Sequence, residues 1–168
     1  MSKNIVLIGM PGAGKSTVGV ILAKILGYSF LDTDLVIQSK EEKLIKDLIA
    51  EKGIDGFINT ENRVISKISA ESTVIATGGS VVYSENAMKA LSVNAVIVYL
   101  KLAYNELRKR LSDIRNRGVV IRKGQSLEEL YDERTVLYEK YADIVVDENG
   151  CTIEKTVNRI LAEIAASL

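Results

Sequence analysis

The sequence predicts an α/β fold around a mostly parallel β-sheet, because short strand-like runs alternate with stretches of helical periodicity. The expected strands are rich in β-branched and other apolar residues; they are Asn4–Ile8, Ser29–Asp32, Thr73–Ala76, Ala95–Leu100 and Asp143–Val146. A glycine-rich segment directly follows the first strand and leads into a helical stretch, as in a βαβ unit. With 168 residues the chain is long enough for one domain with its own core, and we expect a single domain over residues 1–168.

Helices are expected between these strands, where apolar residues recur every three or four positions. The stripes are Val18, Ile21, Leu22 and Ile25; Val64, Ile65 and Ile68; and Ile153, Val157, Ile160, Leu161 and Ile164. Two segments interrupt the alternation. Residues 34–68 are long enough for a small subdomain, and Arg115–Gln125 is a basic, glycine-containing surface loop. Ser126–Glu129 then has the pattern of a capping box that begins the next helix.

Composition excludes several classes of function. The 22 basic residues balance 22 acidic ones, so no overall charge attracts the chain to nucleic acid or to a membrane surface. There is no histidine, which removes Ser-His-Asp chemistry, histidine metal sites and a histidine-activated Cys151. The single cysteine forms no internal disulfide, and neither a signal peptide nor a membrane-spanning stretch is evident. We therefore expect a cytoplasmic protein.

The segment Gly9–Thr17 matches the P-loop pattern G-x-x-x-x-G-K-[ST] in full. The backbone N–H groups of such a loop and the N-terminus of the following helix surround phosphates. Lys15 should reach the β- and γ-phosphates, and the Ser16 hydroxyl should bind Mg²⁺. The expected nucleotide contacts are Gly12, Ala13, Gly14, Lys15, Ser16 and Thr17. The sequence thus predicts a binding site for ATP and Mg²⁺.

A P-loop alone does not define the reaction. A GTPase would need a D-x-x-G motif after the next strand and an N-K-x-D motif to read guanine. The one D-x-x-G is Asp147–Gly150, near the end of the chain, and N-K-x-D is absent. These absences argue against a GTPase.

Two carboxylates, Asp32 and Asp34, stand where the second strand ends, and Gly78 and Gly79 follow the third strand. Ligands of open α/β sheets bind beyond the carboxyl ends of the strands, so both segments should lie near the γ-phosphate. Strand alternation would put Asp32 and Asp34 on the same side if the strand continued. One could serve Mg²⁺ and the other could orient a hydroxyl nucleophile. The alternative is a turn with solvated carboxylates.

These motifs, in this order, resemble the shikimate kinase family of P-loop phosphotransferases over nearly the whole chain. The resemblance includes Ser16–Gly19, the F-x-D-T-D of Phe30–Asp34, the pair Phe57 and Glu61, and Thr77–Gly79. It continues through Arg117 and through Arg134 with the following Leu137–Glu139 and Ala142–Asp143.

The resemblance implies a role for each matching residue. Asp34 would hold the substrate hydroxyls, Asp32 would act in the outer shell of the magnesium, and Gly78 and Gly79 would offer backbone to the substrate. Arg117 would close over the phosphates from a lid at about residues 112–126, and Arg110 would lie against adenine. Arg134 would pair with the substrate carboxylate. Lys15, Asp34, Asp32 and Arg117 would then be the catalytic set. The implied fold is a five-stranded parallel sheet flanked by helices, as in nucleoside monophosphate kinases.

Periodicity supports part of this assignment. Arg134 shares a helical stripe with Leu127, Leu130, Leu137 and Tyr141, so it should point inward and need an anion. That anion could instead be an Asp or Glu of the chain. Likewise, the arginines around Arg117 could form a solvated basic surface rather than a catalytic lid.

The chain departs from the family pattern at four positions. Ile58 replaces an arginine that forms half of the carboxylate clamp, Ser80 replaces a glycine, Gly118–Val120 replaces P-L-L, and Val136 replaces a proline. Arg63 is a poor substitute for the lost cation, because five helical positions rotate it by about 140°.

The function expected is therefore phosphorylation of a small-molecule hydroxyl, with shikimate as the leading acceptor. A kinase for another hydroxylated metabolite and a non-catalytic nucleotide-binding domain are the alternatives. We expect a monomer that binds a small molecule and neither nucleic acid nor membrane.

Overall fold

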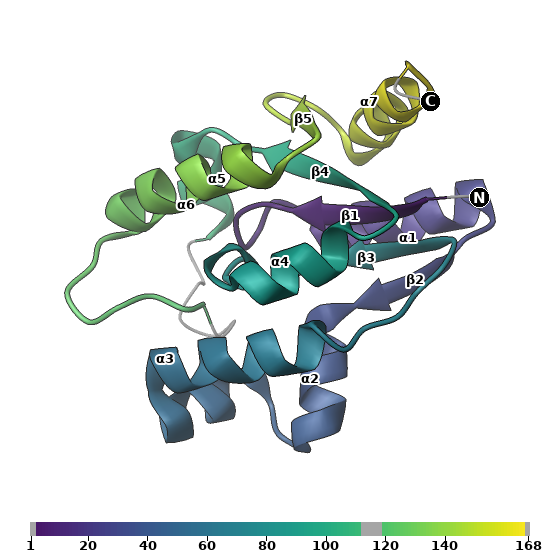
Figure 1. The fold of residues 1–168 in the computed structure, drawn as a ribbon. Helices are drawn as coiled ribbons and strands as arrows, with labels where there is room; N and C mark the ends of the chain where they lie inside the picture. The colour runs from purple at the N-terminus through teal and green to yellow at the C-terminus, as the bar shows by residue number, and fades with distance from the viewer. Residues whose placement is uncertain (1–2, 112–118, 167–168) are drawn as a thin grey trace.

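A computed structural model of the chain describes residues 3–111 and 119–166. Its centre is a sheet of five parallel strands in the order β2-β3-β1-β4-β5 (Figure 1). The strands are β1 (Asn4–Ile8), β2 (Ser29–Asp32), β3 (Thr73–Ala76), β4 (Ala95–Lys101) and β5 (Ile144–Asp147). The predicted five-stranded parallel sheet is confirmed, and three strands have the predicted bounds.

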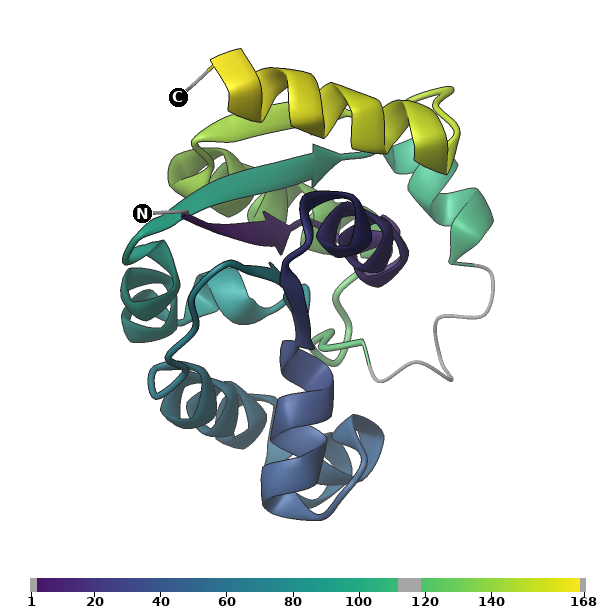
Figure 2. The same ribbon diagram turned by 90° about the vertical axis from the view of Figure 1, so that its right-hand side faces the viewer.

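Helices cover both faces of this sheet. They are α1 (Lys15–Leu26), α2 (Thr33–Glu41), α3 (Ile45–Ile65), the short 3₁₀ helix η1 (Val81–Tyr83), α4 (Glu85–Ser92), α5 (Tyr104–Arg110), α6 (Leu127–Tyr141) and α7 (Ile153–Ala166). The two views show α1 and α7 on one side of the sheet and α4 and α6 on the other, while α2 and α3 extend beyond the β2 edge (Figures 1 and 2). The result is a three-layer α/β arrangement.

The sheet separates two apolar cores. Along β1, Val6 and Ile8 belong to the core shared with α3, α4 and α6, whereas Ile5 and Leu7 belong to the core shared with α1 and α7. Successive side chains of a strand point to opposite faces, so a strand that is covered on both faces must be apolar throughout. All five residues of β1 are buried as a result.

Two expected helix faces differ from the observed ones. On α1, Val18 and Leu22 are buried, but Ile21 and Ile25 are exposed at 37% and 56%. On α7, Ile153 at the first position is likewise exposed. Both helices lie on the same side of the sheet. Each needs only a narrow stripe of apolar residues to cover its part of the sheet.

The region between β2 and β3 consists of α2 and α3. The helical path of α3 is interrupted at Gly53, whose φ of 70° and ψ of 177° lie outside the helical region. Gly53 has no side chain to oppose this left-handed φ. The predicted capping box is confirmed, because the Ser126 side chain accepts from the N–H of Glu129 and the Glu129 carboxylate accepts from the N–H of Ser126.

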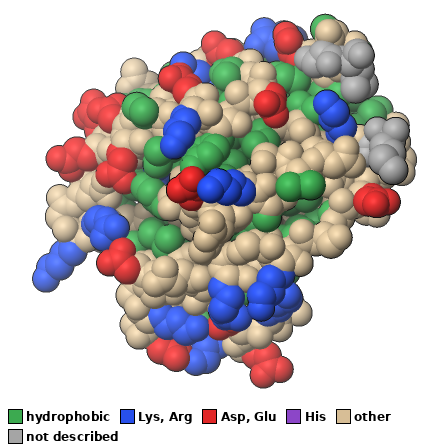
Figure 3. Space-filling view, in the orientation of Figure 1, with side chains coloured by type: hydrophobic (Ala, Val, Ile, Leu, Met, Phe, Trp, Pro, Cys, Tyr) green, Lys and Arg blue, Asp and Glu red, His purple; other side chains and the backbone are tan. Residues whose placement is uncertain are grey.

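Acidic and basic side chains are interspersed on the face shown in Figure 3. Within the described residues, no helix is both long enough and apolar enough to cross a bilayer.

Candidate active site

The P-loop connects β1 to α1 at the carboxyl edge of the sheet. Gly12 and Gly14 have φ of 84°, a left-handed conformation that glycine adopts without steric cost. Gly14 caps α1 without a side-chain hydrogen bond, so the cap leaves the first N–H groups of the helix to other acceptors. This geometry suits a bound phosphate, because those N–H groups and the helix dipole both favour an anion.

Lys15 begins α1 and is 7% exposed. Its Nζ donates to the carbonyl oxygens of Gly9 at 2.7 Å and Met10 at 2.8 Å, which hold the amine beside the loop. Burial lowers the pKa of Lys15 to about 8, although the nearby Asp34 carboxylate opposes this shift. The amine is thus a weakly solvated cation at the place where nucleotide phosphates would lie.

Ser16 and Asp32 meet at the same edge. The Ser16 hydroxyl donates to Asp32 Oδ2 at 2.7 Å, and Asp32 Oδ1 accepts the N–H of Asp34 at 2.9 Å. Asp32 is therefore the N-cap of α2, which satisfies a free donor of the first turn. A hydroxyl and a carboxylate oxygen are hard ligands that suit Mg²⁺, which keeps several waters and binds few protein groups. The described residues contain no cluster of three His, Cys, Asp or Glu side chains that could hold a metal ion.

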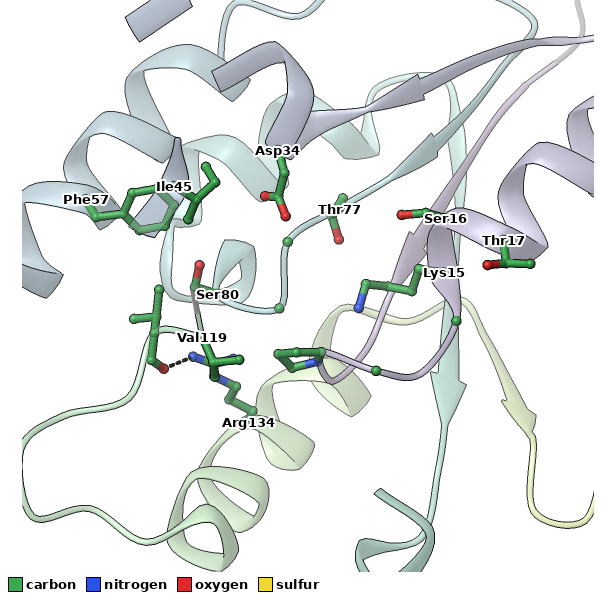
Figure 4. Close-up of a pocket in the computed structure, with 16 residues that line it drawn as sticks. Lys15, Ser16, Thr17, Asp34, Ile45, Phe57, Thr77, Ser80, Val119 and Arg134 are labelled. Carbon is green, nitrogen blue, oxygen red and sulfur yellow. Dashed lines mark hydrogen bonds between the residues drawn. The ribbon is translucent and has the colours of Figure 1, made fainter. Parts of the chain in front are cut away.

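The strand does not continue past Asp32 as the alternation argument required. Helix α2 begins at Thr33 instead, because the Asp32 cap turns the chain. Asp32 consequently faces Ser16, while Asp34 lines a pocket that residues of the P-loop also line (Figure 4). The two carboxylates are close but differ in surroundings.

Asp34 is largely enclosed, and burial, reinforced by the Asp32 charge, raises its pKa to about 6, against the opposing attraction of Lys15. A carboxylate with this pKa is mainly ionised at neutral pH and is a stronger base than an ordinary aspartate. The position and basicity of Asp34 therefore suit acceptance of a hydroxyl proton.

A second carboxylate, Glu61 of α3, lies beside Asp34. It is fully buried; Ser80 donates to its Oε2 at 2.7 Å, and its Oε1 has no hydrogen-bond partner among the described residues. Burial raises the pKa of Glu61 to about 7. A Cβ on Gly78 would lie 2.8 Å from Asp34 Oδ1 and 3.1 Å from Glu61 Oε1, so both carboxylates converge on this glycine. Glu61 is not among the site residues predicted from the sequence, although the pair Phe57 and Glu61 is part of the family resemblance.

Gly79 allows Pro11 of the P-loop and Arg134 of α6 to approach the backbone after β3. A Cβ at this position would lie 2.7 Å from Pro11 Cδ and 2.9 Å from Arg134 Nη1. The Tyr138 hydroxyl donates to the Gly79 carbonyl oxygen at 2.6 Å and so holds the backbone that follows β3. A side chain at position 79 would therefore collide with both Pro11 and Arg134.

Arg134 is 1% exposed, as its place on the apolar stripe predicts. Its Nη2 donates to the Val120 carbonyl oxygen at 2.5 Å (Figure 4). Its Nε donates to the Tyr83 hydroxyl at 3.3 Å. Within the described part of the chain, no carboxylate forms a salt bridge with this guanidinium. Burial of a cation is costly unless an anion is close, so Arg134, which has the Glu61 charge nearby but forms no salt bridge with it, is suited to an anionic ligand.

The remaining arginines differ in placement. Arg110, at the end of α5, donates to the Gly12 carbonyl oxygen at 3.4 Å and so lies against the P-loop. Arg63 forms a salt bridge with Glu41 and is not among the residues that line the pocket. Arg117 and the first part of the expected lid, residues 112–118, lie outside the described residues.

One pocket of about 320 Å³ connects these groups (Figure 4). Its lining includes Gly12, Gly14, Lys15, Ser16, Thr17, Asp34, Gly78, Gly79 and Arg134, together with apolar Pro11, Ile45, Phe57, Val119 and Val120. One end is therefore suited to phosphates, and the other offers a carboxylate, a guanidinium and an apolar wall. Ala13 of the P-loop is buried, and neither Ala13 nor Ile58 is part of this lining.

Comparison with known proteins agrees with this geometry. Residues 11–165 match the family model described as "Shikimate kinase". A shikimate kinase of Francisella tularensis subsp. holarctica is 40% identical over 163 residues, covering 95% of this chain and 93% of the relative. One of Thermodesulfovibrio yellowstonii is 38% identical over 164 residues, covering 96% and 94%. The solved shikimate kinase of Acinetobacter baumannii in complex with shikimate superposes with a TM-score of 0.89 at 30% identity, covering 98% of this chain and 94% of that one. The chain belongs to the shikimate kinase family.

Proposed function

We propose that this protein transfers the γ-phosphoryl group of ATP to a ring hydroxyl of shikimate and forms shikimate 3-phosphate. The observation that carries the proposal is the single pocket that extends from the P-loop to Arg134, with Asp34 on its wall. Family membership and the solved relative bound to shikimate support the choice of acceptor.

The chemistry follows from the placement of the side chains. The P-loop N–H groups and Lys15 bind the β- and γ-phosphates, and Arg134 binds the carboxylate of the acceptor. The acceptor hydroxyl attacks the γ-phosphorus, the bond to the β–γ bridging oxygen breaks, and the hydroxyl proton passes to Asp34. We assign Mg²⁺ to Ser16 and Asp32; when bound, it offsets charge on the phosphate oxygens. We assign Arg110 to the adenine ring of ATP and Arg117 to the phosphates of ATP.

A kinase for another small hydroxylated metabolite is the second candidate. The observation that favours it is the acceptor end of the pocket, where Arg134 is the sole cation among the described lining residues beyond Lys15 of the P-loop. A less anionic acceptor would need only one guanidinium.

The test measures acceptor-dependent ADP release with ATP and Mg²⁺ across shikimate and a panel of other small alcohols and hydroxy acids. Saturation by shikimate at micromolar to millimolar concentration supports the proposal. Turnover with other alcohols alone favours the second candidate, and no acceptor-dependent turnover favours a nucleotide-binding module. Lys15→Ala should abolish transfer while the circular dichroism spectrum stays unchanged; undiminished turnover would remove the catalytic assignment of Lys15.

We also propose that the protein acts as a cytoplasmic monomer without nucleic-acid or membrane partners. The balanced charge supports the lack of nucleic-acid and membrane partners, and sedimentation at working concentration tests the oligomeric state.

A further inference from the structure

A second, small hollow lies beside the acceptor end of the main pocket. Its lining includes Ile58 of α3, Tyr83 of η1, and Val120 and Arg122 of the segment before α6. Val120 lines both the hollow and the main pocket, so the two cavities are neighbours. Ile58, which stands in place of the family arginine, faces this hollow.

Two residues that line the hollow form hydrogen bonds with the buried guanidinium of Arg134. The Tyr83 hydroxyl accepts from Arg134 Nε, and the Val120 carbonyl oxygen accepts from Arg134 Nη2. The Arg134 guanidinium also lies over the Tyr83 ring, 5.3 Å from its centroid. A cation beside the hollow would therefore stand near Arg134, the group assigned to the acceptor carboxylate.

Arg122 is the one cation that lines this hollow within the described residues. Its Nη2 donates to Asp55 Oδ1 at 3.1 Å, and both side chains are exposed, at 59% and 78%. Exposed ion pairs are weak, because water competes for both partners and the long side chains lose rotamer freedom. Arg122 can therefore leave Asp55 at little cost.

We propose that Arg122, which lines the same hollow as Ile58, supplies the second cation for the acceptor carboxylate. The inference rests on the proposed function, because it assigns a determinant of affinity for an anionic acceptor. Arg122 turns from Asp55 toward Tyr83 and Arg134 when the carboxylate binds. Arg122 and Arg134 then contact the carboxylate from two sides, and Ile58 forms the apolar base of the Arg122 stem.

The experiment measures KM for shikimate and for ATP, with kcat, in the wild-type protein and in Arg122→Ala, Asp55→Asn and Lys123→Ala. Lys123 is the exposed neighbour of Arg122 and is the matched control. Arg122→Ala should raise KM for shikimate about tenfold, the loss of one charge-assisted hydrogen bond, with KM for ATP within about twofold. Asp55→Asn should leave KM for shikimate unchanged or lower it, because it frees Arg122. Ile58→Arg should restore much of the affinity lost in Arg122→Ala.

Shikimate methyl ester, which lacks the carboxylate charge, separates charge recognition from folding defects. Wild-type and Arg122→Ala proteins should use the ester equally well. An unchanged KM for shikimate in Arg122→Ala overturns the inference. So does an equal rise in Arg122→Ala and Asp55→Asn, which would mean that the ion pair only holds the segment onto α3. If the wild-type protein does not phosphorylate shikimate, the proposed function fails first, and the inference fails with it.

Discussion

Asp34→Asn should stabilise the ligand-free protein while it abolishes transfer. The pKa of Asp34 is about 6 in the folded protein against an ordinary value of 3.8, chiefly because the carboxylate is buried. At a pH between these two pKa values, Asp34 is more often protonated in the folded state than in the unfolded state. The free energy of unfolding therefore falls as pH rises through this window, and the full loss of stability persists above pH 6.

The magnitude follows from the shift. About two pKa units correspond to about 3 kcal/mol, and this is an upper limit because Asp34 lines a pocket that solvent enters. Asparagine has nearly the same shape and no charge, so it removes the penalty at neutral pH. Loss of the Asp34 charge also eases ionisation of Glu61, whose pKa the Asp34 carboxylate helps to raise. For a chain of this length, a gain of about 3 kcal/mol corresponds to a rise in Tm of about 6 to 12 °C.

The assay is urea unfolding of the wild-type protein and Asp34→Asn from pH 4 to pH 8, with chelator and without nucleotide. The difference in the free energy of unfolding should be largest at pH 7–8 and should shrink toward zero at pH 4. Asp132→Asn, which removes an exposed carboxylate from α6, is the control for a general change in charge. A difference that does not vary with pH, or a less stable Asp34→Asn at pH 7.5, would refute the reasoning.

Three further substitutions test the supporting structure. Gly79→Ala places a Cβ 2.7 Å from Pro11 Cδ and 2.9 Å from Arg134 Nη1, so it should raise KM for the acceptor and lower stability by about 1–3 kcal/mol; wild-type kinetics would contradict this packing. Tyr138→Phe removes the hydroxyl that bonds the Gly79 carbonyl oxygen at 2.6 Å and should cost about 1 kcal/mol in urea unfolding; no loss of stability would mean that this hydrogen bond contributes nothing net. Ser126→Ala removes the capping-box side chain of α6 and should also cost about 1 kcal/mol, with kcat unchanged; an equal loss of kcat would place the cap in the chemistry.

The sequence by itself determined the P-loop, the parallel sheet and the inward position of Arg134. Each depends on interactions over a few residues: glycines that permit left-handed turns, apolar strands that need cover on both faces, and a helical stripe that carries its arginine inward. Such local patterns remain readable without knowledge of what packs against them.

Only the tertiary structure decided how distant segments share the pocket. It showed that Asp32 caps α2 and bonds Ser16, so that Asp34 alone of the pair lines the pocket. It also brought Glu61 to Gly78 and turned Ile58 toward Arg122. These outcomes depend on where α3 and the segment before α6 pack relative to the sheet, and the sum of many long-range contacts sets that packing rather than any short pattern in the chain.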